Sequence, residues 1–296
     1  TLGQEAIPVA AAFALAPGDW VFPALREGAV MLVRGFPLVD FLAQMFGSAR
    51  DAQKGRQMPS HFASRRVAQV SWSSSIGTQL PHAVGMALAA KRLRSRDIAL
   101  AFLGEGATST PDFHAALNLA GVFAAPVVFV CQNNGYALSV PAARQTRSET
   151  FAVKARAYGL PGERVDGNDA LAVLMRIRAR AAEAREGRGP SFIECVTYRR
   201  GPHSSSDDPS RYRSLAEEQA WAERDPLLRL RRHLVLEGVL DDAVEAALVA
   251  ELDRELDGAL ELAFRDPPPA RETLFDDVYA RRPWPLVEQA RELDER

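Results

Sequence analysis

Cysteine, net charge and long apolar runs are all scarce in this chain of 296 residues. The two cysteines, Cys131 and Cys195, each lie inside an apolar run, which is typical of buried free thiols and excludes a disulfide framework. The formal net charge of −2 provides no field that would gather nucleic acid or an anionic membrane. No apolar stretch approaches the roughly 18 residues that a membrane-spanning helix needs. We therefore expect neither nucleic acid nor membrane among its partners.

The rest of the composition is that of a globular protein. Hydrophobic residues make up 47%, charged residues 25% and aromatic residues 8% of the chain. Its length fits one large α/β domain or two smaller ones. No basic segment followed by an apolar stretch opens the chain, so we expect no signal peptide. Together with the free thiols, this favours a reducing, cytoplasmic location.

Apolar segments of strand length alternate with helical patterns up to residue 198. The expected strands span residues 67–71, 98–103, 126–131 and 191–198. The expected helices span about residues 79–94, 111–121, 150–158 and 169–186. Ser109 or Thr110 can cap the second of these helices, and Pro111 suits its first turn. The alternation predicts an α/β fold with a doubly wound, mostly parallel sheet and flanking helices.

The character of the chain changes after residue 198. Residues 199–213 are polar and serine-rich and lack apolar periodicity, as expected of a long functional loop. Helical periodicity then extends over 215–264, and we expect an irregular tail beyond the prolines at 267–269. We therefore predict an α/β domain over 1–213 and a C-terminal helical extension over 214–296.

Unusual residues follow two consecutive strands of the predicted sheet. Gly104-Glu105-Gly106 comes directly after one strand, and Asn134 with its neighbours Asn133 to Tyr136 follows the next. Ligands of open parallel sheets bind beyond the carboxyl ends of the strands, so both side chains are expected in one crevice. Carboxylate and amide oxygens suit Mg²⁺. Either motif alone could be an ordinary turn, and it is their joint placement that predicts a site.

The two motifs begin and end the stretch GEGATSTPDFHAALNLAGVFAAPVVFVCQNN, which resembles the thiamine diphosphate signature. The whole chain, from GQEAIPV to TLFDDVYARRPW, resembles the α subunits of the E1 component of 2-oxo acid dehydrogenase complexes. Among these it most resembles the branched-chain 2-oxo acid dehydrogenases, whose HSxSDD loop is similar to residues 203–208. The resemblance implies a thiamine diphosphate-binding fold.

The resemblance implies thiamine diphosphate and Mg²⁺ as cofactors. The implied metal ligands are Glu105, Asn134 and, through its main-chain carbonyl, Tyr136. The implied cofactor contacts are Arg26, Ser74, Ile76, Gly104, Glu105, Gly106, Ala107, Asn134 and His203. Arg26 matches the arginine that pairs with the terminal phosphate, while Ser74 and Ile76 match positions that hold the aminopyrimidine ring. A structural K⁺ site in some relatives matches Ser73, Ser75, Thr78 and Gln79.

Two histidines match residues close to the reaction. His203 is the implied catalytic donor beside the reacting carbon, and His61 is a second catalytic candidate that lines the substrate pocket. Ser204 matches a serine that kinases modify in mitochondrial relatives.

The sequence also departs from the family pattern. Glu105 replaces the usual Asp, and Leu25 stands where many relatives have Tyr. Gln132 stands where some relatives have Arg, and Thr110-Pro111 replaces a common Glu-Gly. These departures weaken the expected phosphate contacts more than the expected chemistry.

The resemblance implies oxidative decarboxylation of a branched-chain 2-oxo acid and reductive acylation of lipoyl groups on E2. The implied partners are an E1 β subunit, in an α2β2 heterotetramer whose β subunit contacts the C-terminal extension, and the lipoyl domain of E2. We expect the chain to be inactive alone. A pyruvate or acetoin dehydrogenase α subunit and a noncatalytic α/β scaffold subunit remain open. A nicotinamide-binding domain is disfavoured because no G-x-G-x-x-G opens a helix after a strand.

Overall fold

The computed structural model describes residues 2–295, which form two compact units. The first unit comprises residues 2–36 and 63–248, and the second comprises residues 37–62 and 249–295. This grouping differs from the expected boundary at 213/214, because the helices that follow the polar loop belong to the first unit. Trp221 stacks on Tyr198 with ring centroids 5.3 Å apart, and Arg200 pairs with Asp225 at 2.7 Å. These contacts join the helices to the segment that follows the last strand.

A five-stranded parallel sheet organises the first unit, with strand order β1-β2-β3-β7-β6. The strands are β1 Trp20–Phe22, β2 Ala99–Gly104, β3 Val127–Asn133, β6 Gly162–Asp166 and β7 Ser191–Val196. The three central strands β2, β3 and β7 are almost completely buried, which explains their unbroken apolar sequences. The predicted α/β fold with a parallel sheet is confirmed.

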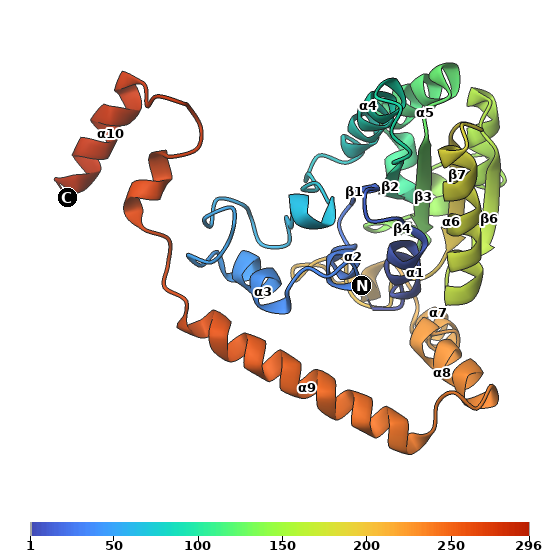
Figure 1. The fold of residues 1–296 in the computed structure, drawn as a ribbon. Helices are drawn as coiled ribbons and strands as arrows, with labels where there is room; N and C mark the ends of the chain where they lie inside the picture. The colour runs from blue at the N-terminus through green and yellow to red at the C-terminus, as the bar shows by residue number, and fades with distance from the viewer. Residues whose placement is uncertain (1, 296) are drawn as a thin grey trace. The chain divides into compact units, whose positions relative to one another are not determined.

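Helices cover both faces of this sheet, as a doubly wound fold requires (Figure 1). α1 and α6 pack on one face with Leu100 and Val128, whereas α4 and α5 pack on the other with Ala101 and Phe129. Successive strand residues thus supply opposite cores. The helices of this unit are α1 Ala6–Ala14, α2 Gly28–Val33, α4 Gln79–Arg92, α5 Pro111–Phe123, α6 Ala170–Arg185, α7 Leu215–Ala222 and α8 Pro226–Leu236.

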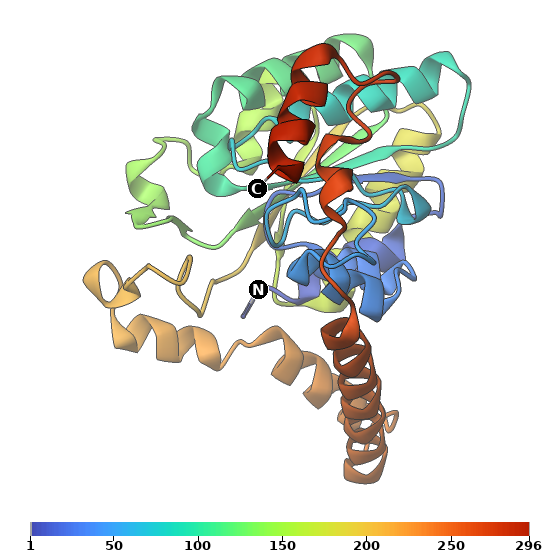
Figure 2. The ribbon, with the colours of Figure 1, turned by 90° about the vertical axis from the view of Figure 1, so that its left-hand side faces the viewer.

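Short elements connect the longer ones. The 3₁₀ helices of the first unit are η1 Arg65–Val67, η2 Glu105–Ser109, η3 Ala142–Arg144, η4 Ala152–Tyr158 and η5 Pro209–Arg211. A small hairpin is formed by β4 Tyr136–Ala137 and β5 Val140–Pro141. The helix expected at 150–158 is thus the 3₁₀ helix η4. The polar loop at 199–213 is confirmed, with η5 as its regular element (Figure 2).

The strand expected at residues 67–71 is wrong. Ala68 has a left-handed backbone with φ 49°, and Gln69 makes isolated bridges to Val21 and Ser64. The segment therefore runs beside β1 without continuing a ladder. The edge position belongs to β1, and β6 forms the opposite edge. Neither strand was expected, because β1 has three residues and three of the five residues of β6 are charged.

The second unit contains α3 Leu38–Phe46, η6 Arg271–Phe275 and α10 Trp284–Asp294. α9 Asp242–Arg265 begins in the first unit and continues into the second. Leu42 of α3 packs against Ala259 and Ala263 of α9. The irregular tail expected after 267–269 is a wrong prediction, because α10 lies within it. Within residues 2–295, we find no helix with the length and apolarity of a membrane span.

Candidate functional site

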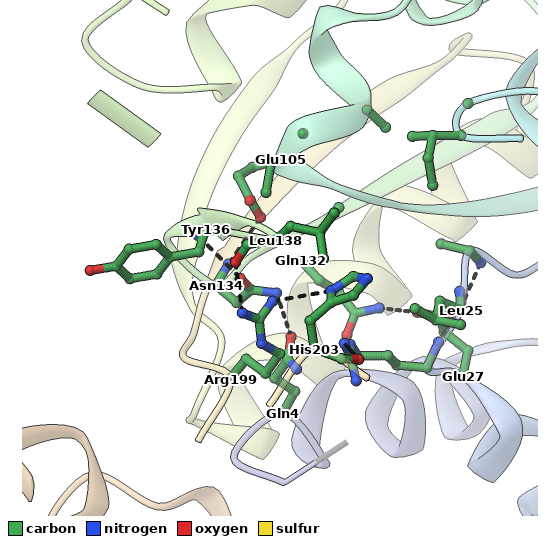
Figure 3. A pocket seen from close by; sticks show the side chains of 18 of the residues that line it. Gln4, Leu25, Glu27, Glu105, Gln132, Asn134, Tyr136, Leu138, Arg199 and His203 are labelled. Carbon is green, nitrogen blue, oxygen red and sulfur yellow. Dashed lines mark hydrogen bonds between the residues drawn. The ribbon is translucent and has the colours of Figure 1, made fainter. Parts of the chain in front are cut away.

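A cavity of about 370 Å³ lies at the carboxyl ends of β2 and β3 (Figure 3). It collects most of the site residues predicted from the sequence. Those that line it are Arg26, Ile76, Gly104, Glu105, Gly106, Ala107, Asn134, Tyr136 and His203. Ser74 is not among the described residues that line it, although its neighbours Ser73 and Ile76 are. The volume is that of a typical small-molecule site.

The two strand-end motifs meet, as the sequence predicts. Gly104 and Gln132 are register partners on β2 and β3, so the residues that follow them emerge side by side. The main-chain N–H of Asn134 donates to Glu105 Oε2 at 3.2 Å. Glu105 is 1% exposed, and burial raises the pKa of its carboxyl above the ordinary range. The hydrogen bonds of Asn134 and Gln145 and the charge of Arg199 oppose this shift only in part, so a cation entering here would meet a buried carboxyl whose pKa stays raised.

The Asn134 side chain is held at both ends. Its Oδ1 accepts a hydrogen bond from the main-chain N–H of Tyr136 at 3.2 Å, and its Nδ2 donates to Gln4 Oε1 at 3.2 Å. The Tyr136 ring points away from this pair, and its hydroxyl donates to Glu217 Oε2 at 2.9 Å (Figure 3). Burial, followed by the contact with Glu217, raises the pKa of Tyr136 to about 12. The Tyr136 hydroxyl is therefore bound to Glu217, away from Glu105 and Asn134.

A buried carboxylate that the sequence analysis missed organises the turn before Arg26. Glu27 is 1% exposed, and its Oε2 accepts main-chain hydrogen bonds from Ala24, Leu25 and Arg26 at 2.7, 2.9 and 3.1 Å. Its Oε1 accepts from the side chain of Gln132. Burial raises the pKa of Glu27 despite these bonds. The sequence did contain a signal for Glu27, because this acid directly follows Arg26, the predicted phosphate-binding arginine.

Arg199, also missed, joins His203 to the wall of the cavity. Arg199 Nη1 lies 3.4 Å from His203 Nδ1, and Nη2 donates to Leu138 O at 2.9 Å. Arginine can only donate, so Nδ1 is an acceptor and the neutral ring carries its proton on Nε2. Arg26 Nη2 donates to the main-chain oxygen of His203 at 3.1 Å. Burial, then Arg26 and Arg199, lowers the pKa of His203 below its ordinary value.

Asp207 also holds the loop that carries His203. Asp207 Oδ2 accepts hydrogen bonds from the main-chain N–H of His203 at 2.7 Å and from the Tyr212 hydroxyl at 2.6 Å. These two bonds lower the pKa of Asp207. The second predicted histidine, His61, belongs to the other compact unit, where its Nδ1 lies 3.3 Å from Pro59 O. Its expected place in the substrate pocket stays a prediction.

A second cavity borders the first through shared residues. It is lined by the positions of the expected K⁺ site, Ser73, Ser75, Thr78 and Gln79, together with Phe22, Val70, Ser71 and His82. The K⁺ site itself stays a prediction.

The main cavity has the wall chemistry that a ligand with anionic oxygens requires. Two buried donors, Gln4 Nε2 and Arg199 Nε, lack hydrogen-bond partners within residues 2–295 and could donate to such oxygens. A Cβ on Gly104 would meet no atom within 4 Å, so the backbone there faces open space. No cluster of three or more His, Cys, Asp or Glu residues that could hold a metal occurs in this described part. A cation would therefore depend on Glu105, amide or main-chain oxygens and the bound anion.

Comparison with known proteins agrees with this arrangement. Residues 1–272 match the sequence family described as dehydrogenase E1 component. The chain is 46% identical over 290 residues to 2-oxoisovalerate dehydrogenase subunit alpha 2, mitochondrial, of Arabidopsis thaliana, covering 97% of this chain and 61% of that protein. It is 41% identical over 292 residues to the Homo sapiens 2-oxoisovalerate dehydrogenase subunit alpha, mitochondrial, covering 98% and 66%.

A bacterial relative gives a similar match. The 3-methyl-2-oxobutanoate dehydrogenase subunit alpha of Mycobacterium tuberculosis is 44% identical over 279 residues, which cover 94% of this chain and 73% of that protein. The chain thus spans between about three fifths and three quarters of the length of these relatives.

Proposed function

Since the chain belongs to the dehydrogenase E1 component family, we propose that it is the α subunit of a branched-chain 2-oxo acid dehydrogenase. In this role it would take part in oxidative decarboxylation of the 2-oxo acid and reductive acylation of a lipoyl group on E2. The observation that carries the proposal is the single cavity in which Glu105, Asn134, Arg26 and His203 converge. The names of the relatives support the branched-chain substrate over pyruvate.

Thiamine diphosphate and Mg²⁺ are the proposed occupants of this cavity. Glu105, the Asn134 amide oxygen and the Tyr136 carbonyl would hold the metal, while Arg26 and the backbone of Gly104 to Ala107 would contact the diphosphate. When bound, the cofactor supplies a carbon nucleophile for the 2-oxo carbon and an electron sink for decarboxylation. The open space at Gly104 and the unpaired donors of the wall fit such an anion.

His203 would act as the proton donor of the site. Its Nδ1 accepts from Arg199, so Nε2 carries the proton that the neutral ring can offer. The lowered pKa of His203 keeps the imidazole neutral near pH 7. A neutral donor stabilises developing negative charge without adding a third cation beside Arg26 and Arg199.

The test of this proposal is a binding and turnover measurement on the chain combined with an E1 β subunit. We expect the pair to bind Mg²⁺ and thiamine diphosphate and to prefer 2-oxoisovalerate over pyruvate in kcat/KM. Glu105→Ala should abolish Mg²⁺-dependent cofactor binding, whereas the same change at the exposed Glu149 should leave it intact. Normal binding by Glu105→Ala would favour a noncatalytic scaffold, and a preference for pyruvate would overturn the substrate assignment.

A further inference from the structure

Gln4 is a buried amide that the proposed function does not yet use. It is 0% exposed, precedes α1, and lines the main cavity. The chain beside it is held closely against the end of β7. Gly3 has φ +88°, a Cβ on it would lie 2.5 Å from Tyr198 O, and Thr197 Oγ1 donates to Gly3 O at 3.0 Å. The Gln4 side chain is therefore presented from a fixed backbone.

Gln4 and the main-chain N–H of Tyr136 together hold the Asn134 amide in one orientation. Asn134 Nδ2 donates to Gln4 Oε1 at 3.2 Å (Figure 3). An amide carries its oxygen and its nitrogen on opposite sides, so Oδ1 is turned away from Gln4. There it accepts from the N–H of Tyr136 at 3.2 Å, next to the contact of the Asn134 main chain with Glu105. The reversed amide would present N–H donors where a cation needs an oxygen.

The other end of the Gln4 amide, its Nε2, is a donor that a bound ligand could satisfy. Gln4 Nε2 is buried and finds no acceptor within the part of the chain that is described, although its residue lines the cavity. An unpaired buried donor is unfavourable, and an anionic oxygen in the cavity would satisfy it.

We propose that Gln4 is a positioning residue that turns the Asn134 amide oxygen toward the metal and donates through Nε2 to the diphosphate. The inference rests on the proposed function, because it assumes that Mg²⁺ and thiamine diphosphate occupy this cavity. Gln4 would thus act on both ligands. Its Oε1 would orient Asn134 for the metal, and its Nε2 would donate directly to the diphosphate.

Two substitutions at Gln4 separate these contributions. Gln4→Met keeps the length of the side chain but removes both the acceptor and the donor. Gln4→Glu keeps an acceptor for Asn134 Nδ2 and removes the donor. Gln69→Met is the matched control, because Gln69 is another buried amide of the same unit and is not among the described residues that line the cavity.

The measurement is calorimetric titration of the complex with the β subunit. The complex is titrated first with Mg²⁺ at saturating thiamine diphosphate, and then with thiamine diphosphate at saturating Mg²⁺. For Gln4→Met we expect both half-saturation concentrations to rise about tenfold, as for the loss of one good hydrogen bond. For Gln4→Glu only the value for thiamine diphosphate should rise, and for Gln69→Met neither should.

Binding of both ligands by Gln4→Met within about twofold of the wild type would overturn the inference. If Gln4→Met does not fold, Gln4→Glu decides, because an unchanged half-saturation by thiamine diphosphate would contradict the donor role. Failure of the wild-type complex to bind either ligand would instead remove the proposed function on which the inference rests.

Discussion

At the scale of single residues, burial sets the chemistry of the site. Glu105 and Glu27 are both 1% exposed, and desolvation raises the pKa of both carboxyls. Their partners differ, however. Glu27 accepts three main-chain hydrogen bonds and one from Gln132, so it shapes the turn that presents Arg26. Glu105 has the main-chain N–H of Asn134 and faces the cavity. Glu27 and the proposed metal ligand Glu105 therefore differ in their partners, not in their burial.

The raised pKa of Glu105 predicts that Mg²⁺ binding releases protons when the pH is near or below that pKa. The metal requires the ionised carboxylate, so binding lowers a pKa that burial has raised, and the proton is lost to the solvent. Affinity for Mg²⁺ should therefore fall as the pH is lowered through that raised pKa. Calorimetry in buffers of different ionisation enthalpy measures the release. Glu105→Gln should remove both the release and most of the affinity, and an unchanged proton count in that variant would contradict the assignment.

The charge of Arg199 predicts the titration of His203. Burial lowers the pKa of His203 first, and the positive charges of Arg26 and Arg199 lower it further. Arg199→Gln should therefore raise the pKa of His203, which NMR of the histidine ring carbons can follow. The exposed Arg211, in the same loop, provides the control, and Arg211→Gln should leave the titration unchanged. An unchanged or lower pKa in Arg199→Gln would contradict the effect of Arg199 on His203.

Among the secondary-structure elements, the site depends on the abrupt change from β2 to the two helices that follow it, η2 and α5. β2 gives way to the 3₁₀ helix η2 at Glu105, and α5 begins at Pro111 after Thr110. Thr110 Oγ1 accepts from the N–H of Phe113 at 3.4 Å and donates to Ala107 O at 2.8 Å. The side chain thus closes the η2 turn and caps α5 at once. Of the two caps that the sequence allowed, Ser109 and Thr110, the structure selects Thr110.

Removal of this cap should destabilise the protein measurably. Thr110→Ala leaves the first turn of α5 without its side-chain acceptor, and we expect a loss of about 1 kcal/mol in the free energy of unfolding. Urea denaturation monitored by circular dichroism provides the value. Thr110→Ser retains the hydroxyl and should recover most of the loss. Equal losses in the two variants would assign the effect to the methyl group and not to the cap.

At the scale of the whole molecule, the chain presents one half of the chemistry that the proposed reaction needs. In the proposed reaction, the residues that converge in the cavity would contact the diphosphate, hold the metal and supply one proton donor. Large apolar side chains also remain exposed at four-residue intervals on α9, at Leu248, Leu252 and Leu256. Both features agree with a subunit that works in a complex.

The isolated chain should consequently be inactive. We expect no turnover of 2-oxoisovalerate above background by the purified chain, and activity on addition of an E1 β subunit, with sedimentation showing an α2β2 assembly. Heat-denatured β subunit is the control for stimulation by contaminants. Turnover by the chain alone, at a rate that β does not raise, would refute the dependence on a partner.

Local sequence patterns were sufficient to identify the central strands of the sheet. Unbroken apolar strands identified β2, β3 and β7, because strands buried on both faces need apolar residues at every position. The order of strand, loop and helix then placed Glu105 and Asn134 beyond the carboxyl ends of β2 and β3, where the main-chain N–H of Asn134 donates to Glu105 at 3.2 Å. Parallel strands must end on the same side, so this part of the site needed no tertiary information.

The hydrogen-bond partners of these residues depend on contacts between distant parts of the chain. Gln4 reaches Asn134 across 130 positions of the chain, and Gln132 reaches Glu27 across 105. No periodicity encodes such pairs, because each depends on how separate helices and strands pack. The same holds for β1, which has three residues and exists as a strand through its pairing with β2. Local sequence patterns specify which segments form, whereas long-range packing specifies which polar atoms are buried together.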